Sequence, residues 1–538
     1  MNSPVTETNQ SSHVAIDEPR KSRVAVWLER AIVFWLFAFA VSAPHSIAAT
    51  QIAWSCGMLC WVVRFFFRPR PRPYRTPVDY ALLGFFILTF ISSLLSYEQN
   101  ISIGKLRGVS LFTIVYLVAE NVRSRRVLRA LALVLIASCM VNVCYTIGAR
   151  IIGHGVKVEG VAANSPLRAA VFVGEGNRET ASPIQNGDTI LEVNGKPLHS
   201  PAELVAALDN SSIANSSAAH ADTILVKIYR VEWTPVLKIP RGHLLDGATP
   251  LERLGLASWS RGRDWRAGGF YGQDVTYAEA LQLIASLALG LFIALRNKRN
   301  RMGVLLLLAL AGLGCALLLT VTRASWLAFL VSAFVIVLIG TSRRTALIVA
   351  ACALPLVIVG LLVLRQQRQV GFYDQSDQST TWRETVWREG FNLLKSEPRH
   401  LLVGVGMDSI KSHWREWGLF DNGRIPIGHM HSTPLQLAVE RGIPTLLVYL
   451  IWMIVYALML WRLLRSGKVD GWIERGILLG ALGGLVGFIT SGMVHYNFGD
   501  SEVVMIFYFI MGLSLVIERE TRKEEDATPH ANLRDATI

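Results

Sequence analysis

Long apolar runs recur along most of the sequence, and they restrict the fold more than any other feature. Runs such as 303–320 and 325–341 contain no charged residue. A helix of ~20 apolar residues crosses the ~30 Å hydrocarbon core of a bilayer. Hydrophobic residues make up 52% of the 538 residues and charged residues 17%, which is less charge than soluble enzymes usually carry. The sequence therefore predicts a polytopic α-helical membrane protein.

The apolar runs form three groups that together predict about twelve spanning helices. The first group covers 25–149, the second 275–364 and the third 443–518. The individual spans are expected near 25–44, 47–67, 79–97, 104–121, 128–149, 275–295, 303–320, 325–341, 345–364, 443–464, 474–494 and 502–518.

The charge of the short loops predicts the orientation. Arginines and lysines gather in the loops 68–75, 123–126, 296–301 and 343–344, and such loops stay on the cytoplasmic side. The tails 1–24 and 519–538 are then cytoplasmic, and the polar composition of the second tail predicts disorder. Because the net charge of +13 lies in these loops, we expect membrane lipid and no nucleic acid as its partner.

Two long segments fall on the opposite, periplasmic side: 155–242, between the fifth and sixth helices, and 365–442. The first has strand-like alternation around Asp188–Val193 and an Asn194-Gly195 pair typical of a hairpin turn. This pattern resembles a PDZ domain, which predicts a small α+β domain at 155–242. Such domains bind extended peptides. A peptide or protein partner and a purely structural spacer both remain open.

The segment 365–442 ends in a histidine motif. His431-Ser432-x-x-Leu435, followed by Glu440, Gly442 and Ile443, resembles a motif of the O-antigen ligase and polymerase superfamily. A histidine near its ordinary pKa can take a proton from a sugar hydroxyl. The resemblance implies that His431 is the general base. Neighbouring His429 has no counterpart in this motif, and we expect it to be a polar surface residue.

Three arginines lie beside further short resemblances to the same superfamily. Arg323 begins an Arg-x-x-x-Leu element, Arg383 an Arg-x-x-x-Trp element, and Arg266 precedes glycines before the sixth helix. The guanidinium group suits a diphosphate because it makes bidentate, charge-assisted contacts. Anchoring at the membrane surface is the alternative role. His495, Asp500 and Glu440 are weighed as possible sugar contacts.

The resemblance implies a metal-independent glycosyltransferase of the bacterial inner membrane, with its active site in the periplasm and no cofactor. Its donor would be a glycan linked to undecaprenyl diphosphate. The acceptor would be lipid A core for a ligase, a second lipid-linked glycan for a polymerase, or a protein. A membrane scaffold or a transporter is the alternative without catalysis.

Overall fold

The computed structural model describes residues 22–348, 351 and 378–535, except 72, 174–178, 210–221 and 231–233. It is mostly helical, and within the described residues ten helices are long and apolar enough to cross a membrane. These are α1 (Arg23–Ser42), α2 (Ile47–Arg64), the broken helix α4, η1 and α5 (Gln99–Asn121), α6 (Arg125–Ile152), α9 (Asp274–Ala294), α10 (Arg301–Leu319), α11 (Arg323–Gly340), α17 (Thr433–Arg465), α18 (Trp472–Gly492) and α19 (Ser501–Asp535). The expectation of a polytopic membrane protein is confirmed.

The helices follow the predicted spans closely. A shorter apolar helix, α3 (Asp79–Leu94), matches the third span. The ninth predicted span, 345–364, lies almost entirely outside the described residues. The total of twelve spans therefore stays a prediction.

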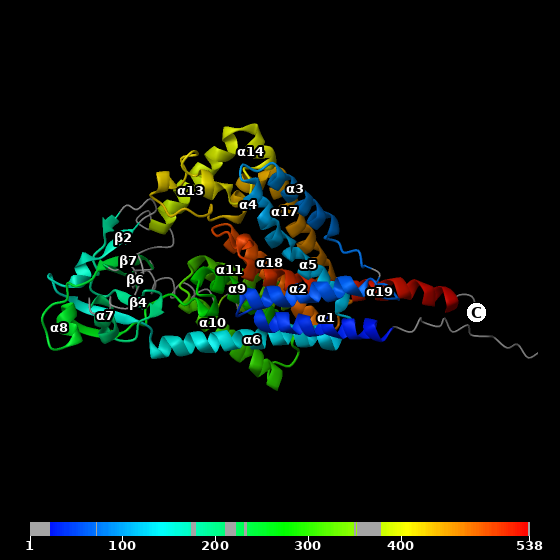
Figure 1. Cartoon of the computed structure of the whole chain (residues 1–538). Coiled ribbons are helices and arrows are strands. Elements are labelled where there is room, and N and C mark those ends of the chain that lie inside the picture. The colour runs from blue at the N-terminus through cyan, green and yellow to red at the C-terminus, as the bar shows by residue number, and fades with distance from the viewer. Residues whose placement is uncertain are drawn as a thin grey trace, which may run out of the picture.

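The long helices lie alongside one another, with a strand domain at one end of the bundle (Figure 1). The start of α1 and the end of α19 point away from that domain. α9 and α18 approach so closely that a Cβ added to Gly290 would stand 2.3 Å from the backbone nitrogen of Gly480. Small residues permit this backbone contact between membrane helices. α9, α18 and α19 are mostly buried and form the centre of the bundle.

The last helix extends further than the sequence indicated. Disorder was expected from residue 519, but α19 continues to Asp535. Arg519 is 4% exposed and donates to the backbone carbonyls of Ala119 and Val122. These carbonyls lie at the end of α5, where a helix leaves acceptors unpaired. That contact extends the ordered helix beyond the apolar run.

The segment between α6 and α9 folds around an antiparallel sheet of order β3-β2-β7-β6-β4-β1-β8, with β5 beside β4. Its strands are β1 (Val156–Val161), β2 (Val171–Val173), β3 (Glu179–Ala181), β4 (Thr189–Val193), β5 (Lys196–Pro197), β6 (Thr223–Tyr229), β7 (Val236–Pro240) and β8 (Leu256–Arg261). Its helices are α7 (Pro201–Leu208) and α8 (Pro250–Leu254). Asn194 and Gly195 both have positive φ between β4 and β5, so the predicted hairpin turn is confirmed.

The strand domain is longer than the predicted 155–242. Strand β8 pairs with β1 along its length, with Val156 opposite Arg261 and Val161 opposite Leu256. The boundary was misplaced because β8 exposes most of its side chains, so it lacks the apolar alternation that marks a strand. The resemblance to PDZ domains stays a prediction.

One long helix and three short ones precede α17 in the described part of this segment. They are α13 (Gln378–Ser396), α14 (Pro398–Val403), α15 (Ser409–His413) and α16 (Phe420–Gly423). α17 begins at Thr433 and not near 443 as expected, but it breaks at Gly442, where φ is +82°. A Cβ added there would stand 2.3 Å from the carbonyl oxygen of Leu402. The break separates a short, mostly buried helical segment, 433–441, from the apolar span that the sequence predicted.

Replacing Gly442 by alanine is expected to destabilise the protein by roughly 2–4 kcal/mol, because a left-handed backbone and a close contact are both unfavourable for alanine. The matched control is Gly148→Ala in α6, where an added Cβ meets nothing within 4 Å. Thermal unfolding of the purified protein in detergent measures both variants. Equal midpoints for the two would contradict this account of the break.

Candidate active site

The predicted catalytic histidine lies in a loop that two helices hold in place. Trp387 of α13 donates from Nε1 to the carbonyl of Met430 at 2.9 Å, and Met430 donates its N–H to Oε1 of Gln436 at 2.6 Å. His431 itself has φ of +47°. A strained backbone of this kind persists only where its surroundings fix it. The loop is therefore a defined structure at the start of α17.

His431 is paired with His429. The backbone N–H of His431 donates to Nδ1 of His429 at 3.1 Å, and the ring centroids are 4.3 Å apart. Because Nδ1 of His429 accepts this bond, its neutral ring carries the proton on Nε2. His429 was expected to be a polar surface residue; the structure leaves it half-buried, with this hydrogen bond and the Tyr496 ring, 5.8 Å away between centroids, beside it.

Both histidines are held neutral. Burial lowers the pKa of His431 to about 3, with further contributions from His429 and from the positive charge of Arg383. Burial also lowers the pKa of His429 to about 4, assisted by His495, Lys411 and Arg383. The helix of Arg383, α13, also contacts this loop through Trp387. At neutral pH each ring has an unprotonated nitrogen available to accept a proton.

The histidine pair should make the fold sensitive to acid. Both pKa values are lower in the folded protein than the ordinary 6.5, so the unfolded chain binds more protons between about pH 6.5 and pH 4. The stability that the neutral histidines contribute is fully present above pH 6.5. It is lost as the pH decreases, and at pH 5 the free energy of unfolding is lower by about 2 kcal/mol per histidine. Thermal unfolding of wild type and His429→Gln from pH 8 to pH 4.5 measures this. An unchanged pH dependence in the variant would contradict it.

Of the other two predicted arginines, Arg266 already has an ion-pair partner and hydrogen-bond partners within the protein. Its Nε lies 2.9 Å from Oδ2 of Asp274 and donates to the carbonyl of Thr320, and its Nη2 donates to the carbonyl of Val321 at 3.1 Å. These contacts fix the turn directly before Arg323, the first residue of α11. Arg266 is thus a positioning residue for that turn. The sequence pattern could not distinguish it from a ligand-binding arginine.

The predicted sugar contacts His495 and Asp500 flank a buried glutamate. Nδ1 of His495 lies 3.2 Å from Oε1 of Glu279 in α9. Asp500 accepts from Oγ1 of Thr276 at 2.9 Å, and burial together with Glu279 raises the pKa of Asp500 to about 7. The backbone carbonyl of His495 also accepts from the N–H of Thr433 at 3.0 Å. His495 therefore joins the end of α18 to the start of α17.

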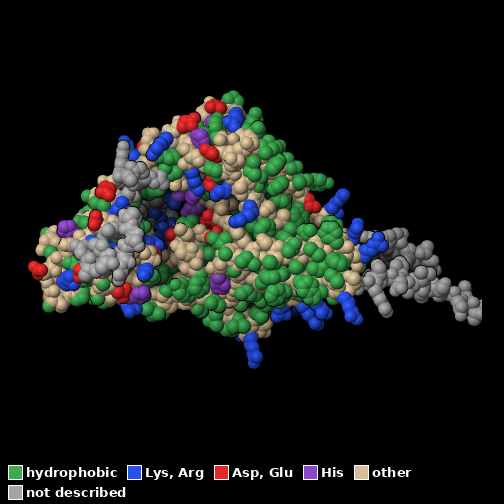
Figure 2. Space-filling view, viewed as in Figure 1, with side chains coloured by type: hydrophobic (Ala, Val, Ile, Leu, Met, Phe, Trp, Pro, Cys, Tyr) green, Lys and Arg blue, Asp and Glu red, His purple; other side chains and the backbone are tan. Residues whose placement is uncertain are grey.

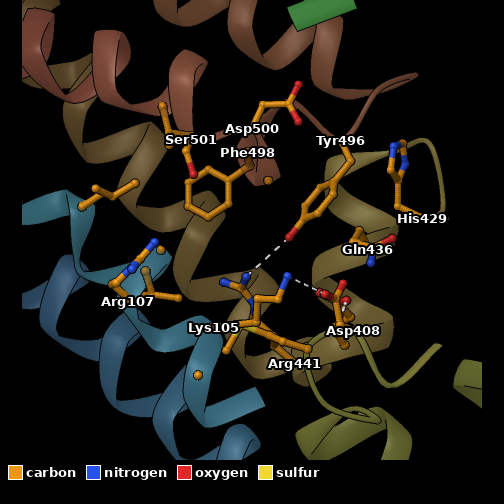
Figure 3. A pocket seen from close by; sticks show the side chains of 18 of the residues that line it. Lys105, Arg107, Asp408, His429, Gln436, Arg441, Tyr496, Phe498, Asp500 and Ser501 are labelled. Atoms are coloured by element: carbon orange, nitrogen blue, oxygen red, sulfur yellow. Dashed lines mark hydrogen bonds and ion pairs between the residues drawn. The ribbon is translucent and has the colours of Figure 1, made fainter. Parts of the chain in front are cut away.

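A cavity of about 660 Å³ opens beside the histidine pair. Figure 2 shows a further hollow between the strand domain and the α13–α14 region, where Lys, Arg and His side chains gather; none of the residues that line the 660 Å³ cavity belongs to those two regions. Of the residues predicted from sequence, Glu440 and Asp500 line the cavity. Its further polar lining includes Lys105, Arg107, Asp408, Lys411, His429, Gln436, Arg441 and Tyr496, most of which Figure 3 labels.

Sequence reasoning missed most of this lining because it comes from distant segments. The available signal was the presence of charged residues at the ends of apolar runs, such as Lys105 and Arg441, since ionisable groups in membrane segments usually mark function. Glu440 is 2% exposed, and its Oε1 accepts the backbone N–H of Asp408 at 2.8 Å. Its role in the structure is to hold the turn before α15. Within the described residues, no group of three or more His, Cys, Asp or Glu could hold a metal ion.

Fold and site together define a polytopic membrane protein with a polar cavity and a neutral histidine pair at one end of its helices. Residues 305–450 match the family model described as O-antigen ligase. The predicted resemblance is thereby confirmed, and it supports a membrane glycosyltransferase of the ligase and polymerase type. The matched segment contains Arg323, Arg383, His431 and Glu440. No curated protein matches the chain.

Proposed function

We propose that the chain transfers a glycan from undecaprenyl diphosphate to an acceptor hydroxyl on the periplasmic face of the inner membrane. One observation carries the proposal: α13, the helix that contains Arg383, holds the loop of His431 through the hydrogen bond from Trp387 to the carbonyl of Met430, and both residues lie within the segment that matches O-antigen ligases. A base and a cation in one site are what a displacement with an anionic leaving group needs.

The reaction follows from these two groups. A ring nitrogen of His431 accepts the proton of the acceptor hydroxyl, and the hydroxyl oxygen forms a bond to the anomeric carbon. The bond from that carbon to the diphosphate oxygen breaks, and the electron pair leaves with the lipid diphosphate. Arg383 and Arg323 stabilise the charge of this leaving group, and the anomeric centre is inverted.

Donor binding would also make His431 a stronger base. In the free protein burial and Arg383 keep the pKa of His431 at about 3, well below the range in which a general base works best at neutral pH. A bound diphosphate places negative charge next to Arg383 and offsets its effect, so the pKa of His431 rises. The base therefore becomes effective once the leaving group is present.

The proposed side of the membrane rests on charge and on arrangement. The basic loops favour cytoplasmic termini. The start of α1 and the end of α19 point away from the strand domain (Figure 1). The histidine site lies at the start of α17 and the end of α18. The strand domain shares the periplasm with the site, where it would meet a peptide or protein partner. A peptide strand could not add beside β1, because β8 already pairs with β1 there.

Glycan analysis of a deletion strain tests the proposed function and separates its variants. Long lipid-linked chains that fail to reach lipid A core indicate a ligase, and accumulated single repeats indicate a polymerase. Loss of glycan from an envelope protein indicates protein glycosylation. Glycans identical to those of the complemented strain would reject the transferase and favour a scaffold.

A further inference from the structure

Arg441 is a buried cation that has no carboxylate within ion-pair distance among the described residues. It is 5% exposed, and its Nε and Nη1 atoms have no hydrogen-bond partner among the described residues. Its remaining contacts are weak: Nη2 donates to the Tyr496 hydroxyl at 3.4 Å, and the guanidinium lies 5.5 Å from the Phe85 ring centroid. A buried charge that lacks partners is strongly unfavourable. Such an arrangement is expected where a ligand completes it.

Two other cations of the cavity are ion-paired within it. Nζ of Lys105 lies 2.6 Å from Oδ2 of Asp408, and Nζ of Lys411 lies 3.1 Å from Oδ1 of the same carboxylate. Within the described residues no carboxylate lies within ion-pair distance of Arg441, and the carboxylate of adjacent Glu440 accepts the N–H of Asp408. Arg107 also lines the cavity but is exposed to solvent, so Arg441 is the buried cation that an incoming anion would pair with.

The cavity extends to the histidine pair, because His429 is one of its lining residues. Figure 3 shows Tyr496 between Arg441 and His429, and the contacts form a series: Arg441 to the Tyr496 hydroxyl, the Tyr496 ring to His429, and His429 to His431. The cavity is lined from α2, α4, α17 and α19. The residues that line the cavity include none from α13, the helix that carries Arg383.

We infer that the Arg441 cavity is the acceptor site and that it takes a glycan bearing a phosphate or carboxylate group. This inference rests on the proposed function, because a transferase brings two substrates to one base. The donor diphosphate is assigned to Arg383 and Arg323, which leaves the cavity for the acceptor. Its volume of about 660 Å³ is in the usual range of small-molecule sites. Arg441 anchors the anionic group, and the hydroxyl to be glycosylated points toward the histidines.

The test measures equilibrium binding to the purified full chain in detergent, with glucose 6-phosphate, glucuronate and neutral glucose as acceptor probes and farnesyl diphosphate as donor probe. The variants are Arg441→Met, Arg441→Lys and Arg383→Gln. Arg424→Met is the control, since this arginine is 79% exposed. We expect Arg441→Met to weaken at least one anionic sugar about tenfold or more, and Arg441→Lys to recover part of that loss. Arg383→Gln and Arg424→Met should leave it unchanged.

The donor probe should give the opposite pattern. Arg383→Gln weakens the binding of farnesyl diphosphate, and Arg441→Met does not. Arg441→Met should also unfold at a higher temperature than wild type without ligand, because it removes an unpaired buried charge. A midpoint at or above that of wild type shows that lost binding is not misfolding.

Three results would overturn the inference: anionic sugars that do not bind wild type at millimolar concentration, binding unaffected by Arg441→Met, or farnesyl diphosphate weakened by Arg441→Met, which would place the donor in this cavity. Failure of the proposed function is seen separately, as glycans unchanged by deletion of the chain.

Discussion

Replacing His431 by alanine is expected to reduce glycan transfer at least about 100-fold, because general bases contribute roughly 10²–10⁴ to the rate. The side chain is a neutral imidazole in a fixed loop, and its main chain is held by Nδ1 of His429 at 3.1 Å. The variant removes the proton acceptor and leaves Arg383 in place. Donor binding should therefore be retained while transfer is lost.

The rate of transfer in isolated membranes measures this, with farnesyl diphosphate binding as the test of an intact donor site. His429→Ala is the informative comparison. It loosens the backbone of His431 without removing the base, so we expect a loss of about tenfold, smaller than a catalytic loss. Full activity of His431→Ala, or a larger loss in His429→Ala, would mean that His429 is the general base.

Replacing Arg383 by glutamine should reduce transfer by about 10²–10³, the usual effect of removing one group that stabilises a developing charge. The same change should raise the pKa of His431, because the positive charge of Arg383 contributes to its low value of about 3. Activity of the variant should therefore fall more steeply than that of wild type as the pH decreases below 6.

The measurement is the pH dependence of transfer by wild type, Arg383→Gln and Arg266→Gln. Arg266 is engaged by Asp274 and by backbone carbonyls, so its variant should lose stability and not change the pH profile. If Arg383→Gln kept both the rate and the pH profile of wild type, the diphosphate would have to bind elsewhere.

The helical fold could be predicted from sequence because apolar length and loop charge are local properties. Every predicted span that falls within the described residues has a helix. The end of α19 was missed because its order depends on a contact between Arg519 and α5, which are distant in sequence. Strand β8 was missed for a similar reason: pairing with β1 forms it, and its own composition does not indicate a strand.

The site was predictable only in part. The matched motifs led to His431 and Arg383, and the helix of Arg383 contacts the loop of His431 through Trp387. They did not indicate that Arg266 is used within the fold, that His429 accepts a hydrogen bond from the His431 backbone, or that two nitrogens of Arg441 have no partner among the described residues. These properties depend on which neighbours surround each side chain. Tyr496, which lies between Arg441 and His429, comes from the turn between α18 and α19, far from either in sequence.

Release of undecaprenyl diphosphate tests the central claim most directly. Membranes of the deletion strain, which contain the native acceptor, are supplied with labelled lipid-linked glycan and either wild-type protein or His431→Ala. The account predicts that wild-type protein releases undecaprenyl diphosphate as glycan joins the acceptor, and that the variant releases little of either product. Equal release with wild type, variant and no added protein would contradict a glycosyltransferase.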